Sequence, residues 1–244
     1  MAHHPGMMKF SPGLLLALLM VGCGPSGQKA EPTRQSAQPE VSAKVALPDV
    51  SPGVWTTRDE KGQPFDIVLF QNGQAVSTWV NGPARAKGQR GFWRIVDGQI
   101  FLLFDDGWSD WIVMRDGEPV HKGFAPGLSL AESPTNSSPA LRFDGDAVTF
   151  VGVWRLNREP DGSYLYLSLQ ANGAAYSTIN GITDGRWEVV DGVAKVTWPD
   201  GWVDQLERSG GSWQKQSWVG GDSGTPADLT QATRVGETKF VVTP

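Results

Sequence analysis

The sequence has little of the chemistry on which metal proteins and many enzymes depend. It contains one Cys and three His among 244 residues. A single Cys excludes a disulfide framework within the chain, and the low counts exclude Cys-rich and His-rich metal sites. The sequence also lacks a Gly-x-Ser-x-Gly nucleophile motif and a glycine-rich phosphate loop. We therefore expect no metal and no cofactor, and we assign no catalytic residue.

Basic runs and helical periodicity are absent as well. The chain carries 21 Lys and Arg against 26 Asp and Glu, a net charge of −5, and no basic block, so nucleic acid is not an expected partner. No window of ten or more residues repeats with a helical period. The 30 Gly and 17 Pro are instead typical of short strands joined by tight turns.

The N-terminus carries the pattern of a secretory leader. An apolar run over 14–21 follows Lys9 and is too short to span a bilayer as a helix. It ends in Met20-Val21-Gly22-Cys23, which resembles the lipobox of bacterial lipoproteins. That resemblance implies that Cys23 is acylated and that its acyl chains hold the protein to a membrane. An ordinary cleaved signal peptide with a stray Cys is the alternative.

The residues after Cys23 have the composition of a disordered tether, with Pro, Gln, Ser, Ala and no aromatic residue up to Ala46. We therefore predict a signal peptide over 1–22 and an acylated Cys with a disordered tether over 23–46. The expected location is the bacterial cell envelope. Gly24 after the cysteine favours the outer membrane in a Gram-negative cell.

The rest of the chain is an internal duplication. Gly53-Val54-Trp55 recurs as Gly152-Val153-Trp154, and further matches follow in the same order. They include Asn72-Gly73 with Asn172-Gly173, Trp93 with Trp187, Asp106-Gly107-Trp108 with Asp200-Gly201-Trp202, Asp110 with Asp204, and Arg142 with Arg234. The sequence thus predicts two repeat units, over 47–146 and 147–244.

Each unit consists of short alternating apolar runs bounded by Asn-Gly or Asp-Gly pairs. Strands are predicted over 65–70, 74–80, 92–96, 100–104 and 108–114, and over 164–169, 174–180, 187–190 and 193–198. The Asn-Gly and Asp-Gly pairs favour type I′ hairpins, in which both central residues need positive φ. The predicted fold is all-β, with two tandem small antiparallel meander β-barrels of seven or eight short strands each.

A Gly-x-Trp that opens a unit, with an Arg in its last strand, resembles the calycin group of barrels, which includes lipocalins and avidins. The resemblance implies that Arg142 packs across Trp55, and Arg234 across Trp154, near the closed end of each barrel. These units are shorter than lipocalin barrels.

The eleven Trp divide into matched and unmatched positions. Matched rings are expected to fill the barrel interiors. They are Trp55 and Trp154, Trp93 and Trp187, and Trp108 and Trp202, together with Phe104/Trp198 and Phe124/Trp218. The unmatched Trp79, Trp111 and Trp213 are the candidate recognition residues. Their equivalents in the other repeat are Ile179, Gln205 and Pro119. Trp111 is out of phase with Asp110 and Ile112 and is expected on the outer face.

Acidic residues gather near two of the turns. We interpret Asp106-Gly107 and Asp200-Gly201 as hairpin turns, but Asp110 and Asp204 alternate with apolar residues on the inward face. If they are buried they need partners, such as backbone amides or an Arg. His121 is the only His after the leader, its counterpart is Lys215, and no nucleophile motif accompanies it.

These features favour a non-enzymatic, lipid-anchored envelope protein that binds a protein or glycan partner. One alternative is a lipocalin-like carrier of a small apolar ligand, and another is an enzyme on envelope polysaccharide that uses Asp110 or Asp204. Barrel interiors filled by Trp rings in both units would exclude the carrier.

Overall fold

The computed structural model describes residues 46–79, 86–158, 161–179, 183–221 and 223–237. Cys23, the predicted signal peptide and all of the predicted tether except Ala46 lie outside the described residues. Within the described ranges, no helix is long and apolar enough to cross a membrane.

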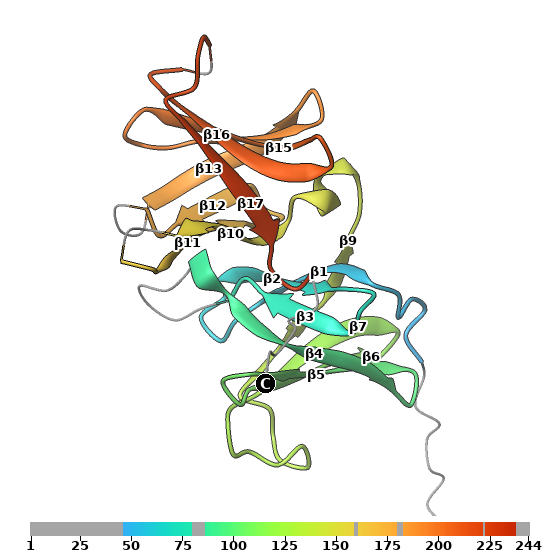
Figure 1. The fold of residues 1–244 in the computed structure, drawn as a ribbon. Helices are drawn as coiled ribbons and strands as arrows, with labels where there is room; N and C mark the ends of the chain where they lie inside the picture. Colours follow the sequence, from blue (N-terminus) through green and yellow to red (C-terminus); the bar gives the residue numbers. More distant parts are fainter. Residues whose placement is uncertain (1–45, 80–85, 159–160, 180–182, 222, 238–244) are drawn as a thin grey trace, which may run out of the picture. The chain divides into compact units, whose positions relative to one another are not determined.

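The described chain is all-β and forms two antiparallel sheets, each curved into a barrel (Figure 1). The first sheet has the order β8-β7-β6-β5-β4-β3-β2-β1-β9. Its strands are β1 (Gly53–Arg58), β2 (Pro64–Leu69), β3 (Gln74–Ser77), β4 (Gln89–Val96), β5 (Gln99–Phe104), β6 (Ser109–Arg115), β7 (Glu118–Phe124), β8 (Asn136–Pro139) and β9 (Leu141–Phe143).

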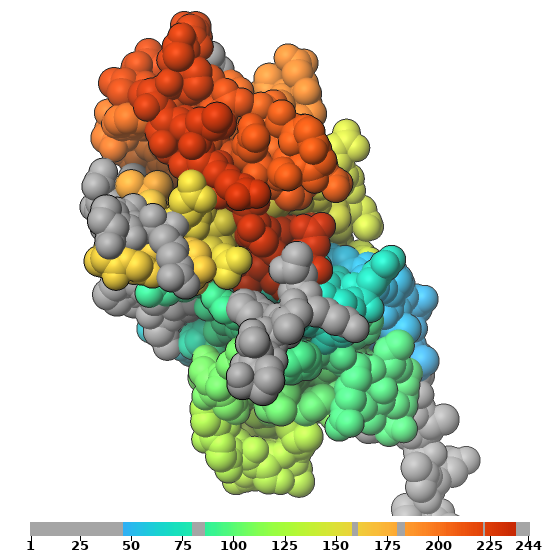
Figure 2. Space-filling model, in the orientation of Figure 1, coloured from blue at the N-terminus to red at the C-terminus, as the bar shows by residue number. Residues whose placement is uncertain are grey.

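The second sheet is a closed barrel in which β10 through β17 pair in chain order and β17 pairs back to β10. Its strands are β10 (Gly152–Arg158), β11 (Tyr164–Leu169), β12 (Ala174–Ser177), β13 (Thr183–Val190), β14 (Val193–Thr197), β15 (Trp202–Ser209), β16 (Ser212–Val219) and β17 (Asp228–Arg234). A 3₁₀ turn, η2 (Asp146–Thr149), precedes it. In the space-filling view the later strands form a continuous orange-to-red surface (Figure 2). The predicted fold class of two small meander barrels is confirmed.

The first barrel is nearly closed, and two short strands lie at its seam instead of one continuous strand. β8 pairs with β7 and β9 pairs with β1, and the buried Ala140 lies between them. Side chains bridge the remaining gap between β8 and β1. Asn136 Nδ2 and Ser138 Oγ both donate to the carbonyl of Arg58, and Thr57 Oγ1 donates to the carbonyl of Pro139. These bonds satisfy edge groups that would otherwise be exposed.

Two kinds of hairpin turn join the strands, whereas the sequence predicted one. Asp97, Asp116 and Asp191 have φ near +50°, and the following glycines also have positive φ, which is the type I′ geometry. At Asn72-Gly73, Asn172-Gly173, Asp106-Gly107 and Asp200-Gly201 only the glycine has positive φ. There the turn asparagine or aspartate accepts a bond from the backbone two residues later, as in Asn72 Oδ1 with the N–H of Gln74. The prediction of type I′ geometry is therefore wrong at these four turns.

Apolar side chains fill each barrel and also lie between the two sheets. Val54 and Val68, from β1 and β2, belong to the same buried cluster as Trp154 and Leu169 of the second barrel. Val76 of β3 packs with Val153 and Val235. Asn72 Nδ2 donates to the carbonyl of Gly236. The two sheets thus share part of their apolar core.

Candidate functional site

The Trp and Arg of each predicted signature pair lie side by side. Trp55 is paired with Arg142 between β1 and β9, and Trp154 with Arg234 between β10 and β17. The guanidinium carbons lie 5.6 Å from the Trp55 ring and 5.9 Å from the Trp154 ring. Both distances are within the range of cation–π contacts.

Each arginine also holds the chain that enters its barrel. Arg142 donates to the carbonyls of Ser51 and Pro52, and Arg234 donates to those of Val148 and Val151. Burial lowers the pKa of Arg234 to about 10, so the side chain remains charged at neutral pH. These pairs organise one end of each barrel.

At the other end of each barrel an inward carboxylate pairs with a basic side chain, Asp110 with His121 and Asp204 with Lys215. The register of β6 with β7 places Asp110 opposite Gly123 and diagonal to His121, and β15 with β16 repeats this with Asp204 and Lys215. His121 Nε2 lies 2.8 Å from Asp110 Oδ2, and Lys215 Nζ lies 3.2 Å from Asp204 Oδ1. The sequence pointed to backbone amides or an Arg as partners. That expectation is wrong, because these strands bring His and Lys to the same face.

Asp204 is the more heavily engaged of the two carboxylates. Trp198 Nε1 donates to its Oδ2 at 2.8 Å, and Lys215 occupies its Oδ1. Lys215 also donates to Ser217 Oγ and lies 3.8 Å from Asp228 Oδ2. Asp204 is 5% exposed and Lys215 is 3% exposed. Such a pair is held by mutual neutralisation and hydrogen bonds, because either charge alone would be costly to bury.

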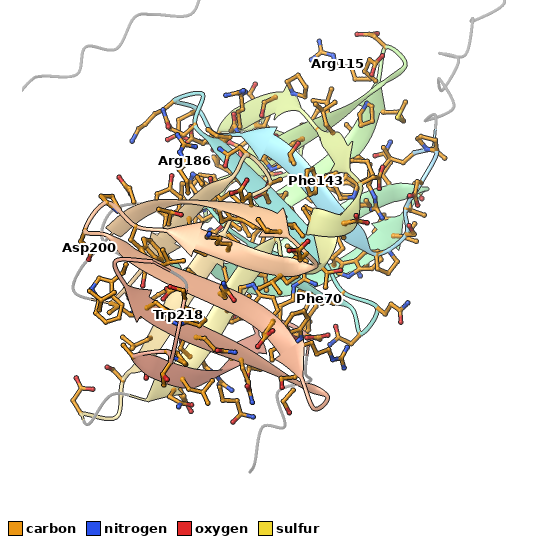
Figure 3. All side chains as sticks on the ribbon, turned by 90° about the horizontal axis from the view of Figure 1, so that it is seen from above. Phe70, Arg115, Phe143, Arg186, Asp200 and Trp218 are labelled. Carbon is orange, nitrogen blue, oxygen red and sulfur yellow. The ribbon has the colours of Figure 1, made fainter. Side chains whose placement is uncertain are left out.

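This pair lines a cavity of about 200 Å³ in the second barrel. Trp198 and Trp202 provide its aromatic walls, and Asp204, Lys215 and Ser217 its polar ones. The other lining residues are Ser177, Ile179, Asp200 and Asp228. Asp200 lies at the turn between β14 and β15 (Figure 3).

The corresponding place in the first barrel is filled. Only about 20 Å³ remains among Phe65, Trp79, Trp108, His121 and their neighbours. Trp79 packs on Trp108 with ring centroids 5.4 Å apart, and its Nε1 donates to Asp59 Oδ2 at 3.3 Å. Its counterpart, Ile179, is smaller and carries no N–H on its side chain. The second barrel has a cavity where the first has almost no space, so its interior does not exclude the carrier alternative.

The matched aromatic residues are not all core. Trp55, Trp154, Trp187, Trp198, Trp218, Phe104 and Phe124 are buried. Trp93, Trp108 and Trp202 are half-buried. Trp108 and Trp202 follow the turns at one end of each barrel and line the space there, instead of filling the interior.

The three unmatched tryptophans lie in three different settings. Trp79 fills the first barrel. Trp111 is half-buried on the outer face, since its neighbours Asp110 and Ile112 face inward, and its ring lies 5.1 Å from that of Phe101. Trp213 packs on Trp154 with ring centroids 4.8 Å apart, against the second core. Packing against the core accounts for the presence of Trp213, so no role in recognition is needed to explain it.

Comparisons of the chain with protein-family models, curated proteins and solved structures gave no match. In the part of the chain that the structure describes, no group of three His, Cys, Asp or Glu residues could hold a metal ion. The assignment of the site therefore rests on the cavity and on the contacts around it.

Proposed function

We propose that the chain is a non-enzymatic, lipid-anchored protein of the bacterial cell envelope that binds a protein or glycan partner through the open end of its second barrel. The observation that supports this is the cavity of about 200 Å³ beside Trp198 and Trp202. It has room for several waters. It is smaller than the pockets of roughly 300–1,000 Å³ that hold drug-sized ligands. The partner therefore inserts one compact group.

One side of the cavity lining is polar, which favours a ligand that carries a hydrogen-bonding group. Lys215, Ser217 and Asp204 form the charged and hydroxyl side of the cavity. An apolar ligand would cover these atoms without offering hydrogen bonds, at a desolvation cost. A carrier of a small apolar ligand is therefore the weaker candidate.

The inward carboxylates give the enzyme alternative little support. Asp204 accepts from Trp198 and Lys215, and Asp110 is bound to His121. Catalytic carboxylate pairs use one carboxyl group as a general acid and the other as a base or a nucleophile, with the scissile bond between them. Turnover of an envelope glycan that is lost in Asp204→Asn or Asp110→Asn would contradict the proposal.

The cavity can be closed by a substitution that the first barrel supplies. Ile179→Trp places an indole where the first barrel has Trp79, whereas Leu103→Trp adds one on the outer face, where Leu103 is exposed. Glycan arrays and envelope extracts are probed with the wild-type chain and both variants. We expect partners bound by the wild type to be kept by Leu103→Trp and lost by Ile179→Trp. Equal binding by all three chains would contradict the proposal.

The anchor requires a separate test. Acylation at Cys23 would make membrane attachment depend on that one side chain, because several acyl chains together give durable binding. We expect Cys23→Ser to move the protein from the membrane fraction to the soluble fraction. A Cys23→Ser protein that still sediments with membranes would contradict acylation at this residue.

A further inference from the structure

In the first barrel a side chain of the chain itself, Trp79, occupies the place where the second barrel has its cavity. The contacts of this side chain indicate which kind of group would fit the cavity. The Trp79 indole packs on Trp108, and its N–H donates to the carboxylate of Asp59. The second barrel retains Trp202 in place of Trp108, but Ile179 replaces Trp79. The aromatic wall is thus conserved between the barrels, while the flat ring that covers it is present only in the first.

The charges around the cavity indicate the sign of the missing group. Among the described lining residues Lys215 is the only cation; it is 3% exposed and is already bound to Asp204 and Ser217. Asp228 also lines the cavity, and its side chain is 55% exposed. Asp200 adds a third carboxylate at the turn. Three carboxylates against one lysine leave the described lining with an excess of negative charge.

Tryptophan faces and carboxylates are both suited to a cationic ligand. A cation is attracted to the face of an indole ring, and a charged N–H group forms a strong hydrogen bond to a carboxylate. We propose that the second barrel binds a flat aromatic ring that bears an N–H donor and a positive charge, as in an indolylalkylamine. The group belongs to a free aromatic amine or to a Trp next to a basic residue on a protein partner. This inference rests on the proposed function and names its ligand class.

Tryptamine is the direct probe, measured by calorimetry on the full chain in detergent. We expect saturable binding of one tryptamine per chain. Indole-3-acetate has the same ring with a negative charge, and we expect it to bind at least about tenfold more weakly. Asp228→Asn should weaken binding of tryptamine severalfold and weaken binding of the uncharged ligand indole less. Methylation of the ring nitrogen removes its N–H and should cost about tenfold, as for one charge-assisted hydrogen bond.

Exchanging the residues at positions 79 and 179 tests the comparison between barrels. Ile179→Trp should abolish tryptamine binding, whereas Leu103→Trp should leave it unchanged. Trp79→Ile should raise the stoichiometry from one to two, because Trp108 and Asp59 remain in the opened first barrel. If Ile179→Trp does not fold, the stoichiometry of Trp79→Ile still decides. Stoichiometry that remains at one would overturn the inference.

A short peptide with Trp between two Lys distinguishes the two sources of the group. Binding of the peptide tighter than tryptamine by tenfold or more supports a protein partner, and the reverse order supports a free amine. Binding of a sugar with no binding of tryptamine or the peptide would overturn this inference and leave the proposed function intact. If partner binding is also insensitive to Ile179→Trp, the proposed function fails as well.

Discussion

Equivalent residues in the two barrels differ in how their buried polar atoms are satisfied. The Trp154 N–H donates to the carbonyl of Phe150 at 2.8 Å. The N–H of Trp55, at the same place in the first barrel, has no partner among the described residues. Burial of an unpaired N–H costs free energy that a hydrogen bond recovers. The same ring therefore contributes unequally to the stability of the two barrels.

This difference predicts unequal effects of Trp→Phe at the two positions. Both substitutions shrink a buried ring, but only Trp154→Phe breaks a hydrogen bond and leaves the Phe150 carbonyl unpaired. We expect Trp154→Phe to lower the free energy of unfolding by about 1–3 kcal/mol more than Trp55→Phe. Urea denaturation of the two variants measures the difference. An equal loss would show that the Trp154 hydrogen bond has no net effect.

Asp66 is a buried carboxyl that makes stability depend on pH. It is 3% exposed, its Oδ2 accepts from the backbone N–H of Ala171, and its own N–H donates to Thr78 Oγ1. Burial raises its pKa to about 7 from an ordinary 3.8. The folded state therefore favours the protonated acid. Its contribution to stability is complete below about pH 4 and is lost as the pH rises to 7.

We expect Asp66→Asn to remove this pH dependence. The amide oxygen can still accept from Ala171, and no charge is buried above pH 7. The variant should be more stable than the wild type at pH 8 by a few kcal/mol, on the order of 1.4 kcal/mol per pKa unit, and close to it at pH 4. Denaturant titrations at both pH values measure this, with the exposed Glu118→Gln as control. A wild type whose stability does not fall between pH 4 and 7 would contradict the assignment.

At the scale of elements, the β4–β5 turn has a role that its counterpart lacks. Gly98 accepts a backbone hydrogen bond from Leu47, whose side chain is buried in the first barrel. A Cβ at Gly98 would lie 2.7 Å from that of Ala46, whereas a Cβ at Gly192 would meet nothing within 4 Å. Both glycines have positive φ. The turn thus holds the incoming chain as well as joining two strands.

Gly98→Ala and Gly192→Ala should separate strain from contact. Both place a Cβ in the left-handed region, at a cost of about 1–2 kcal/mol. We expect Gly98→Ala to cost more than Gly192→Ala, because it also displaces Ala46 and Leu47. Hydrogen exchange should show faster exchange of the Leu47 amide in Gly98→Ala alone. Equal losses of stability, with Leu47 still protected, would contradict this.

Two of the elements that the sequence missed or placed too late lack the usual alternation. β8 has the sequence Asn-Ser-Ser-Pro, whose composition is that of a loop, and it is a strand because its backbone pairs with β7 while its side chains bond to β1. β13 begins at Thr183, earlier than the predicted start at Trp187. Gly185 there admits the Trp198 ring, since a Cβ would lie 2.6 Å from it. Tertiary contacts outweigh local preference in both cases.

The candidate site was predictable only in its parts. The repeats align Asp110 with Asp204, His121 with Lys215, and Trp79 with Ile179. The strand register could have suggested that each acid meets the residue across its hairpin. The difference in space between the barrels follows from the packing of Trp79 on Trp108, which an alignment of repeats does not show.

At the scale of the whole molecule, the shared core couples the two barrels. Asp66, Val68 and Leu69 of β2 are all buried, so both faces of this strand are covered. The run Phe65–Leu69 is mostly apolar rather than alternating, which is itself a signal of burial on both faces. Its outer face packs against the second barrel through Val68 and Asp66.

We therefore expect the two barrels to unfold in one transition. Separation would expose Val54 and Val68 together with their partners, so neither barrel retains its full core alone. Scanning calorimetry of the full chain should give equal calorimetric and van't Hoff enthalpies. Two resolved transitions, or a Val68→Ala variant that destabilises only one of them, would contradict the coupling.

Leu47 gives the molecule a defined point of mechanical loading. If the chain before it is anchored and a partner occupies the second barrel, any pull between them enters at the Leu47–Gly98 bond and passes through β1. From there the load crosses the Val54 and Val68 contacts to reach the second barrel. The apolar contact between the two barrels then transmits the force, and its packing sets the force that the attachment withstands.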